Sequence, residues 1–181
     1  MEKFSELIRI RRSMRKFTEE ELNQDEVVAL LRAALISPSS KGVRPWEFVV
    51  VDNKELLQQL AHCKEHGAEL VEGAPLAVVV LADPTQSDVW VEDASVAMMA
   101  MMLQAAELGL GSCWVQVRHM TAEEKGADGQ CLTSHQYLAR LLDLPEGVEV
   151  EAILALGHEV KKQRPRTLEE ARPERVHWGR V

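Results

Sequence analysis

The sequence predicts a single domain that combines helices with β-strands buried on both faces, and three observations support this fold class. The chain of 181 residues is long enough for one sizeable core and too short for two. The runs 47–52 and 75–83 are rich in β-branched residues and show no polar alternation, which is typical of strands buried on both faces. Around these runs, apolar residues recur at helical spacing.

The N-terminal part of the chain predicts two helices. Residues 3–10 carry apolar residues at helical spacing, and we expect the basic segment 9–17 that follows to form a turn. Asn23 and Glu26 have the spacing of a capping box, which predicts the start of a second helix. Pro38 ends that helix and opens a loop of small hydroxyl residues, glycine and proline.

The middle of the chain predicts two further helices. One includes residues 56–61 and can be closed by Gly67. The other, residues 89–108, is apolar or small on nearly all sides and must therefore be buried on more than one side. A monomer of this size has little room to surround so long a helix, so we expect a homodimer. After it, Gly111 predicts a tight turn that leads into a strand.

The C-terminal part of the chain predicts one helix and one strand. Residues 118–133 have few apolar groups and no clear periodicity, so we expect a mobile surface segment, a candidate lid. Ser134 is expected to cap a short helix that ends before Pro145. The apolar run 148–157 is the last strong strand.

Two clusters of positive charge stand out in a chain whose net charge is −8. The first cluster lies within residues 9–17 and consists of Arg9, Arg11, Arg12, Arg15 and Lys16. The second cluster follows the last strand and consists of Lys161, Lys162, Arg164, Arg166 and Arg172. Either cluster alone is compatible with a solvated surface. Because arginine suits phosphate better than lysine does, the two together predict a site for a phosphorylated ligand.

The composition excludes several classes of function. A pI near 5.3 argues against binding to nucleic acid or to an anionic membrane surface. The longest apolar stretch, residues 94–110, is too short and too interrupted by polar residues to span a bilayer. The N-terminus has no apolar signal region, so we expect a cytoplasmic protein. No phosphate-binding loop, dinucleotide fingerprint, nucleophile elbow or H-E-x-x-H motif is present.

Neither the cysteines nor the histidines predict a catalytic or metal site. Cys63, Cys113 and Cys131 are odd in number and far apart, so we interpret them as free thiols. No base can be assigned to Cys113 as a nucleophile. His62 and His66 are four residues apart, but the sequence places no third ligand nearby, which favours an exposed pair over a metal site.

The remaining features suit one kind of ligand. Two arginine clusters, a serine-rich loop and a buried apolar helix fit a flat, mostly apolar molecule with a phosphate at one end, and flavin mononucleotide (FMN) has this shape. Its phosphate needs charge-assisted donors, its ring needs an apolar wall, and the pyrimidine edge of the ring needs a cation or backbone N–H groups.

Four motifs, in order and spacing, resemble the nitroreductase family of FMN oxidoreductases. They are Arg11–Phe17, Ser37–Trp46, Gly109–Gly111 after a long apolar helix, and Leu156–His158 ahead of Arg164–Arg166. The resemblance implies an α+β sandwich with a central mixed antiparallel sheet wrapped by helices. It also implies an intertwined homodimer with two flavins at the interface. Residues 1–181 would form one FMN-binding domain, with 167–181 as a C-terminal arm that reaches the partner subunit through Val176 and Trp178.

The same resemblance implies the cofactor contacts. Contacts to the phosphate and the ribityl chain are expected from Arg11, Arg12, Ser13, Arg164 and Arg166, with Arg15 nearer the pyrimidine edge. The partner subunit is expected to contribute Pro38, Ser39, Ser40 and the Gly42 position. Wall and backbone contacts to the ring are expected from Cys113, Trp114 and Val115.

Two positions depart from the family pattern, which often reads Ser-x-Asn-x-Gln-Pro-Trp in the loop. Gly42 stands where the family has the asparagine that contacts the flavin, and Arg44 replaces the glutamine. A polar contact to the ring is therefore lost, and the positive charge of Lys41 or Arg44 is a candidate to compensate for it.

The resulting hypothesis is an oxidoreductase without a catalytic side chain. Hydride passes from NADH or NADPH to flavin N5 and then to an electron-poor acceptor, a nitroaromatic or a quinone, by ping-pong exchange. One alternative keeps the fold and changes the flavin chemistry to dehalogenation or dehydrogenation. Another is a non-catalytic protein that binds flavin or a different phosphorylated ligand.

Overall fold

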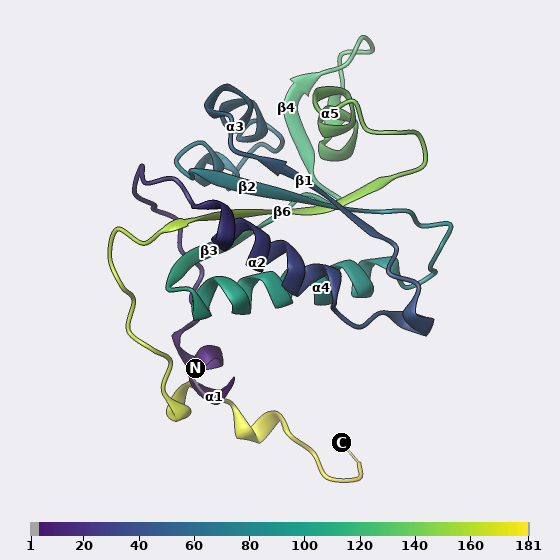
Figure 1. Cartoon of the computed structure of the whole chain (residues 1–181). Helices are drawn as coiled ribbons and strands as arrows, with labels where there is room; N and C mark the ends of the chain where they lie inside the picture. Colours follow the sequence, from purple (N-terminus) through teal and green to yellow (C-terminus); the bar gives the residue numbers. More distant parts are fainter. Residues whose placement is uncertain (1–3, 181) are drawn as a thin grey trace.

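The computed structural model describes residues 4–180, and a four-stranded sheet lies at its centre (Figure 1). The strands follow the order β1 (Trp46–Val51), β2 (Leu76–Ala82), β6 (Glu149–His158) and β3 (Leu110–Gln116), and all neighbours are antiparallel. Residue Ser13 adds a parallel bridge to Ser112 of β3, which makes the sheet mixed. The predicted α+β class, with a mixed and mainly antiparallel sheet, is confirmed.

Helices cover the two faces of this sheet (Figure 1). On one face lie α2 (Gln24–Leu35) and α4 (Trp90–Glu107). On the other lie α3 (Lys54–Leu60), α5 (Ser134–Leu141) and the hairpin of β4 (Thr121–Lys125) and β5 (Cys131–Thr133). The short α1 (Phe4–Ile10) lies beside the C-terminal tail. Single 3₁₀ turns occur at Ser40–Gly42, Glu69–Val71, Leu168–Glu170 and Pro173–Arg175.

The sheet separates two apolar cores. Val78 and Val80 of β2 face α2 and α4, whereas Val79 and Leu81 face α3 and α5. Every residue of β2 is buried, so the prediction of a strand covered on both faces is confirmed there. In β1 it holds only in part, because β1 is an edge strand and several of its residues remain accessible to solvent.

The predictions of helices α2 and α4 are confirmed, and the structure shows the interactions that stabilise each helix. The Asn23 side chain accepts from the Glu26 N–H at 3.0 Å, and the Glu26 carboxylate accepts from the Asn23 N–H at 2.8 Å, so the capping box starts α2. Helix α4 buries its apolar side against the sheet, including three of its four methionines. A stripe of α4 stays partly uncovered, and it consists of Val96, Met99, Ala100 and Leu103.

Several local predictions are wrong. The basic segment 9–17 is extended beyond residue 10 and is not a turn, because its backbone bonds to β3 and to the residues after β6. Gly111 lies inside β3, where it allows a close approach rather than a turn. Helix α3 ends at Leu60, and Gly67, with φ +85°, belongs to a later turn.

The segment expected to be a mobile surface segment and a candidate lid, residues 118–133, contains the β4–β5 hairpin, which the sequence analysis did not predict. Thr133, and not Ser134, caps α5: its hydroxyl accepts from the Gln136 N–H at 3.1 Å. The C-terminal tail runs away from the sheet (Figure 1), and the Trp178 side chain is 94% exposed. Among residues 4–180, no helix has both the length and the apolar character needed to cross a membrane.

Candidate functional site

The two basic clusters meet at one place, although they lie about 150 residues apart in the sequence. The Arg166 N–H donates to the Arg9 carbonyl at 2.9 Å, and the Arg9 Nε donates back to the Arg166 carbonyl at 3.1 Å. Arg12 Nη1 donates to the Arg164 carbonyl at 2.9 Å. The chain segments before β1 and after β6 therefore hold each other in a fixed register.

The N-terminal segment is also fixed to the sheet. The Met14 N–H donates to the Ser112 carbonyl at 2.9 Å, and the Thr18 N–H donates to the His158 carbonyl at 3.0 Å. Gly111 makes this contact possible, because a Cβ there would lie 2.9 Å from the Cβ of Met14. The sheet thus supports the backbone from which the basic side chains project.

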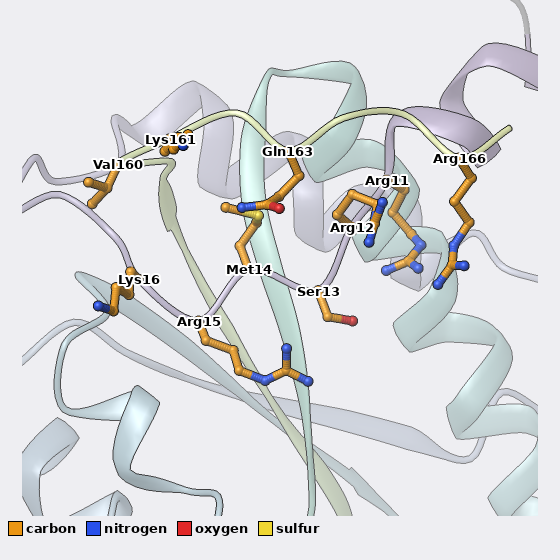
Figure 2. A pocket seen from close by; sticks show the side chains of 10 residues that line it. All are labelled: Arg11, Arg12, Ser13, Met14, Arg15, Lys16, Val160, Lys161, Gln163 and Arg166. Carbon is orange, nitrogen blue, oxygen red and sulfur yellow. The ribbon is translucent and has the colours of Figure 1, made fainter.

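A cavity of about 610 Å³ lies between these segments. In Figure 2 the side chains of Arg11, Ser13 and Arg166 point to the same side, and the Arg15 side chain runs across β3. All four residues line the cavity. The structure therefore brings arginines of both clusters together around one cavity, as the sequence predicts.

The charge of Arg11 is not neutralised by the described residues. Its Nη1 is buried and has no hydrogen-bond partner among residues 4–180. Burial lowers the pKa of Arg11, and the neighbouring charges of Arg166 and Arg12 lower it further. A buried guanidinium nitrogen without a partner is costly, and an anion in the cavity would supply that partner.

Other members of the two clusters serve the chain itself. Arg12 uses Nη1 on the Arg164 carbonyl, and Arg164 Nη2 forms an ion pair of 2.5 Å with Glu170. Arg9 pairs with Glu6 at 2.9 Å as well as with the Arg166 carbonyl. Arg12 lines the cavity and also holds the two chain segments together, whereas the Arg164 side chain is engaged by Glu170 and is not among the residues that line the cavity.

The predicted ring-contacting residues on β3 point to different sides. Cys113 is buried close to Arg15 and Arg11, and burial raises the pKa of its thiol while both charges lower it. The Trp114 side chain lies on the α4 face, where its Nε1 donates to Gln116 Oε1 at 2.9 Å. Val115 belongs to the core on the opposite face. Only Cys113 of the three is thus placed near the cavity side chains.

The loop residues Pro38, Ser39, Ser40 and Gly42 do not reach this cavity within one subunit. The Ser40 N–H donates to Asp93 Oδ1 at 2.7 Å, which places the loop at the N-terminal end of α4. The basic cavity lies near the C-terminal end of α4, since Arg11 and Arg12 also line a smaller adjoining cavity with Ala106 and Gly109. Helix α4 has 18 residues, so its ends are about 27 Å apart.

Five cavity-lining residues were absent from the predicted contacts: Met14, Lys16, Val160, Lys161 and Gln163. Lys16 and Lys161 belong to the two basic clusters, and the other three lie next to, or between, residues of these clusters. Their proximity in sequence was therefore the available signal. Asp93, which holds the loop, gave no comparable signal, because its partner Ser40 is 53 residues away.

The comparison with known proteins points to one family. The profile of the Nitroreductase family matches residues 8–65 and 58–158. A protein of Methanothermobacter thermautotrophicus, provisionally named NADH dehydrogenase/NAD(P)H nitroreductase, is 32% identical over 175 residues, which cover 95% of this chain and 84% of that protein.

Solved structures agree with this match. An FMN-dependent nitroreductase of Clostridium difficile R20291 has a TM-score of 0.92 and 37% identity, covering 98% of this chain and 100% of its own. A provisionally named nitroreductase of Desulfovibrio desulfuricans, solved in complex with FMN, has a TM-score of 0.72 and 25% identity, covering 94% and 95%. On this sequence match and this fold, the chain belongs to the nitroreductase family.

Proposed function

We propose that this protein is an FMN-dependent oxidoreductase that works as a homodimer in the cytoplasm and passes hydride from NADH or NADPH to an electron-poor acceptor. The acceptor class is a nitroaromatic or a quinone. The single observation that supports the cofactor most strongly is the buried Arg11 Nη1 without a partner among the described residues, in a cavity lined by cations from both ends of the chain.

The residues at the cavity fit the parts of FMN. Arg11, Arg166 and Ser13 offer charged and hydroxyl donors on one side, which suits the phosphate. Arg15 extends over β3 near Cys113, which suits a position at the pyrimidine edge of the ring. Arg12 also lines the cavity and can reach the phosphate, while its Nη1 bond to the Arg164 carbonyl keeps the two chain segments in register. We assign the Arg164 side chain an indirect role, because it pairs with Glu170.

The positions of the loop and the cavity at the two ends of α4 support a homodimer. Within one subunit the loop 38–42 and the basic cavity lie at opposite ends of this helix. If two copies of α4 pack antiparallel across a two-fold axis, the loop of each subunit comes to the cavity of the other. The uncovered stripe of Val96, Met99, Ala100 and Leu103 provides an apolar surface for such packing. Each site is then completed by the partner.

The chemistry needs little from the side chains. When bound, FMN would supply hydride transfer between the reduced nicotinamide and the acceptor. The chain's own residues bind the phosphate, orient the ring and place positive charge near its pyrimidine edge. Burial keeps the pKa of the Cys113 thiol raised, so this side chain serves as a neutral part of the wall and not as a nucleophile.

A visible absorption spectrum of the purified protein tests the cofactor directly. We expect flavin bands and, with NADPH or NADH under nitrogen, their bleaching followed by recovery when a nitroaromatic or quinone is added. Initial rates measured against NADPH or NADH at several fixed acceptor concentrations should give the parallel double-reciprocal lines of ping-pong exchange. A colourless protein that takes up no FMN would refute the proposal. Flavin binding without turnover would instead support a binding protein.

A further inference from the structure

Asp93 is a buried carboxylate at the start of α4, with 5% of its surface exposed. Its Oδ1 accepts from the Ser40 N–H at 2.7 Å, and its Oδ2 accepts from the Ser87 hydroxyl at 2.9 Å. None of the ion pairs found among residues 4–180 involves Asp93. Because burying a carboxylate without a cation is costly, these two donors and the helix N-terminus must compensate for it.

The loop that Asp93 holds has an unusual backbone. Lys41, Gly42 and Arg44 have φ values of +53°, +69° and +56°, so two non-glycine residues adopt the left-handed region within four positions. The Arg44 N–H donates to Ser39 Oγ at 2.8 Å, which closes the loop on itself. Such a conformation persists only where the surroundings determine it, and the bond from Ser40 to Asp93 links the loop to the buried part of the protein.

We propose that Asp93 is a positioning residue for the cofactor site, which fixes the loop 39–44 so that it forms the wall contributed across the subunit interface. This inference rests on the proposed function, because the loop reaches a basic cavity only in the two-fold dimer described above. Asp93 is not among the residues that line the basic cavity. It acts by holding the Ser40 backbone, and with it the three left-handed residues that follow.

The two carboxylate oxygens have separable roles. Oδ1 holds the loop through a backbone donor, whereas Oδ2 bonds Ser87 in the segment that leads into α4. Asp93→Asn keeps one oxygen for the Ser40 N–H and places an amide beside Ser87, whose hydroxyl can accept. Asp93→Ala removes both bonds. Ser87→Ala removes only the bond to Oδ2 and keeps the bond between the Ser40 N–H and Oδ1. It therefore tests whether the loss of FMN affinity depends on the bond to the loop.

A second pair of variants removes the donor and leaves Asp93 intact. Ser40→Pro has no backbone N–H, and Ser40 is the first residue of a 3₁₀ turn, where the proline ring is tolerated. Ser40→Ala is its matched control, because it loses the same hydroxyl and keeps the N–H. The difference between these two variants isolates the bond to Asp93 from any contact that the Ser40 side chain makes.

The experiment combines hydrogen–deuterium exchange of the peptide covering residues 38–45 with FMN titration followed by flavin fluorescence, using the full chain. For Asp93→Ala and Ser40→Pro we expect faster exchange in this peptide and FMN affinity weaker by about tenfold, since a hydrogen bond to a charged group contributes enough for such a change. Asp93→Asn should restore affinity to within about threefold of the wild type. Ser87→Ala and Ser40→Ala should leave the exchange of the peptide near the wild-type rate.

Three results would overturn the proposal. Unchanged exchange in Asp93→Ala and Ser40→Pro would show that the carboxylate does not hold the loop. Faster exchange with unchanged FMN affinity would show that the loop is no part of the cofactor site. Equal affinities of the Asn and Ala variants would refute the hydrogen-bonding role of Asp93. A wild-type protein that binds no FMN is a different failure, that of the proposed function, and the exchange data would still report whether Asp93 holds the loop.

Discussion

Replacing Arg11 by methionine should change the stability of the protein in opposite directions with and without FMN. Methionine keeps most of the apolar volume of the arginine stem and removes the charge. In the ligand-free chain, the change removes a buried nitrogen without a partner among the described residues and relieves repulsion by Arg166 and Arg12. In the complex, it removes a charged donor to the phosphate.

The sizes of the two effects can be worked out. A buried unsatisfied donor costs about 1–3 kcal/mol, so we expect the ligand-free variant to gain about 1 kcal/mol, or about 2–4 °C in melting temperature. A hydrogen bond to a charged group contributes about 1.5–3 kcal/mol, which predicts FMN binding weaker by about 10- to 150-fold. At FMN of about 100 times the wild-type Kd, the wild type gains about 2.7 kcal/mol and a variant weakened 100-fold about 0.4 kcal/mol.

The assay is thermal unfolding with and without FMN, together with fluorescence titration of FMN. The melting curves of variant and wild type should exchange their order when FMN is added. Lys125→Met is a matched control that removes one exposed positive charge on the β4–β5 hairpin. Its melting temperature relative to the wild type should be the same with and without FMN. A ligand-free Arg11→Met protein that melts below the wild type while binding FMN equally well would refute the reasoning about this side chain.

Four further outcomes are expected. Gly111→Ala should weaken FMN binding in titrations, because the added Cβ would lie 2.9 Å from Met14 Cβ and displace the basic segment; unchanged affinity would contradict this. Of the three thiols, only the exposed Cys131 should react with Ellman's reagent in the native protein, and a second native equivalent would be inconsistent with the buried positions of the others. Burial raises the pKa of Glu151 in the folded protein above its ordinary 4.5, so the folded state binds this proton more tightly than the unfolded state does. The protein should therefore lose stability as the pH rises from 4.5 through the raised pKa, and Glu151→Gln should flatten this decline of the melting temperature. If the charge of Arg44 compensates for the lost polar contact in the loop, Arg44→Ala should lower FMN affinity and make the flavin potential more negative, and two unchanged values would exclude that role.

The parts of the fold that could be predicted are those set by local signals. The capping box of Asn23 and the continuous apolar run of β2 depend on residues close in sequence, and both are confirmed. The hairpin within 118–133 was missed because its strands are mostly exposed and carry little apolar alternation. Gly111 was misread because a glycine serves equally for a turn and for a close approach. Its neighbour Met14 is distant in sequence, so nothing local distinguishes the two uses.

The sequence could predict which residue clusters form the candidate site, but not which partners each side chain has there. Clusters rich in arginine indicated a shared anion site, since charge density is visible in the sequence. Which arginines remain available for a ligand depends on the partners that the fold gives to each side chain, and these partners can lie far away in the sequence. Arg11 and Arg12 both line the cavity, but Arg12 already donates to the Arg164 carbonyl, whereas Arg11 Nη1 has no partner among the described residues. The support of the loop by Asp93 could not be anticipated either, because its partner comes from a different part of the chain.

The bonds that join Arg9 and Arg12 to residues 164–166 also have a consequence for synthesis of the protein. A ribosome releases the amino end of the chain long before the carboxyl end, so a growing chain carries only half of the basic cavity. The sheet can form once β6 has emerged, whereas Arg166, which lines the cavity from the other side, is synthesised later still. If FMN occupies this cavity as proposed, a growing chain acquires the full site only after residue 166 has emerged, and we expect products that terminate before residue 164 to bind FMN more weakly.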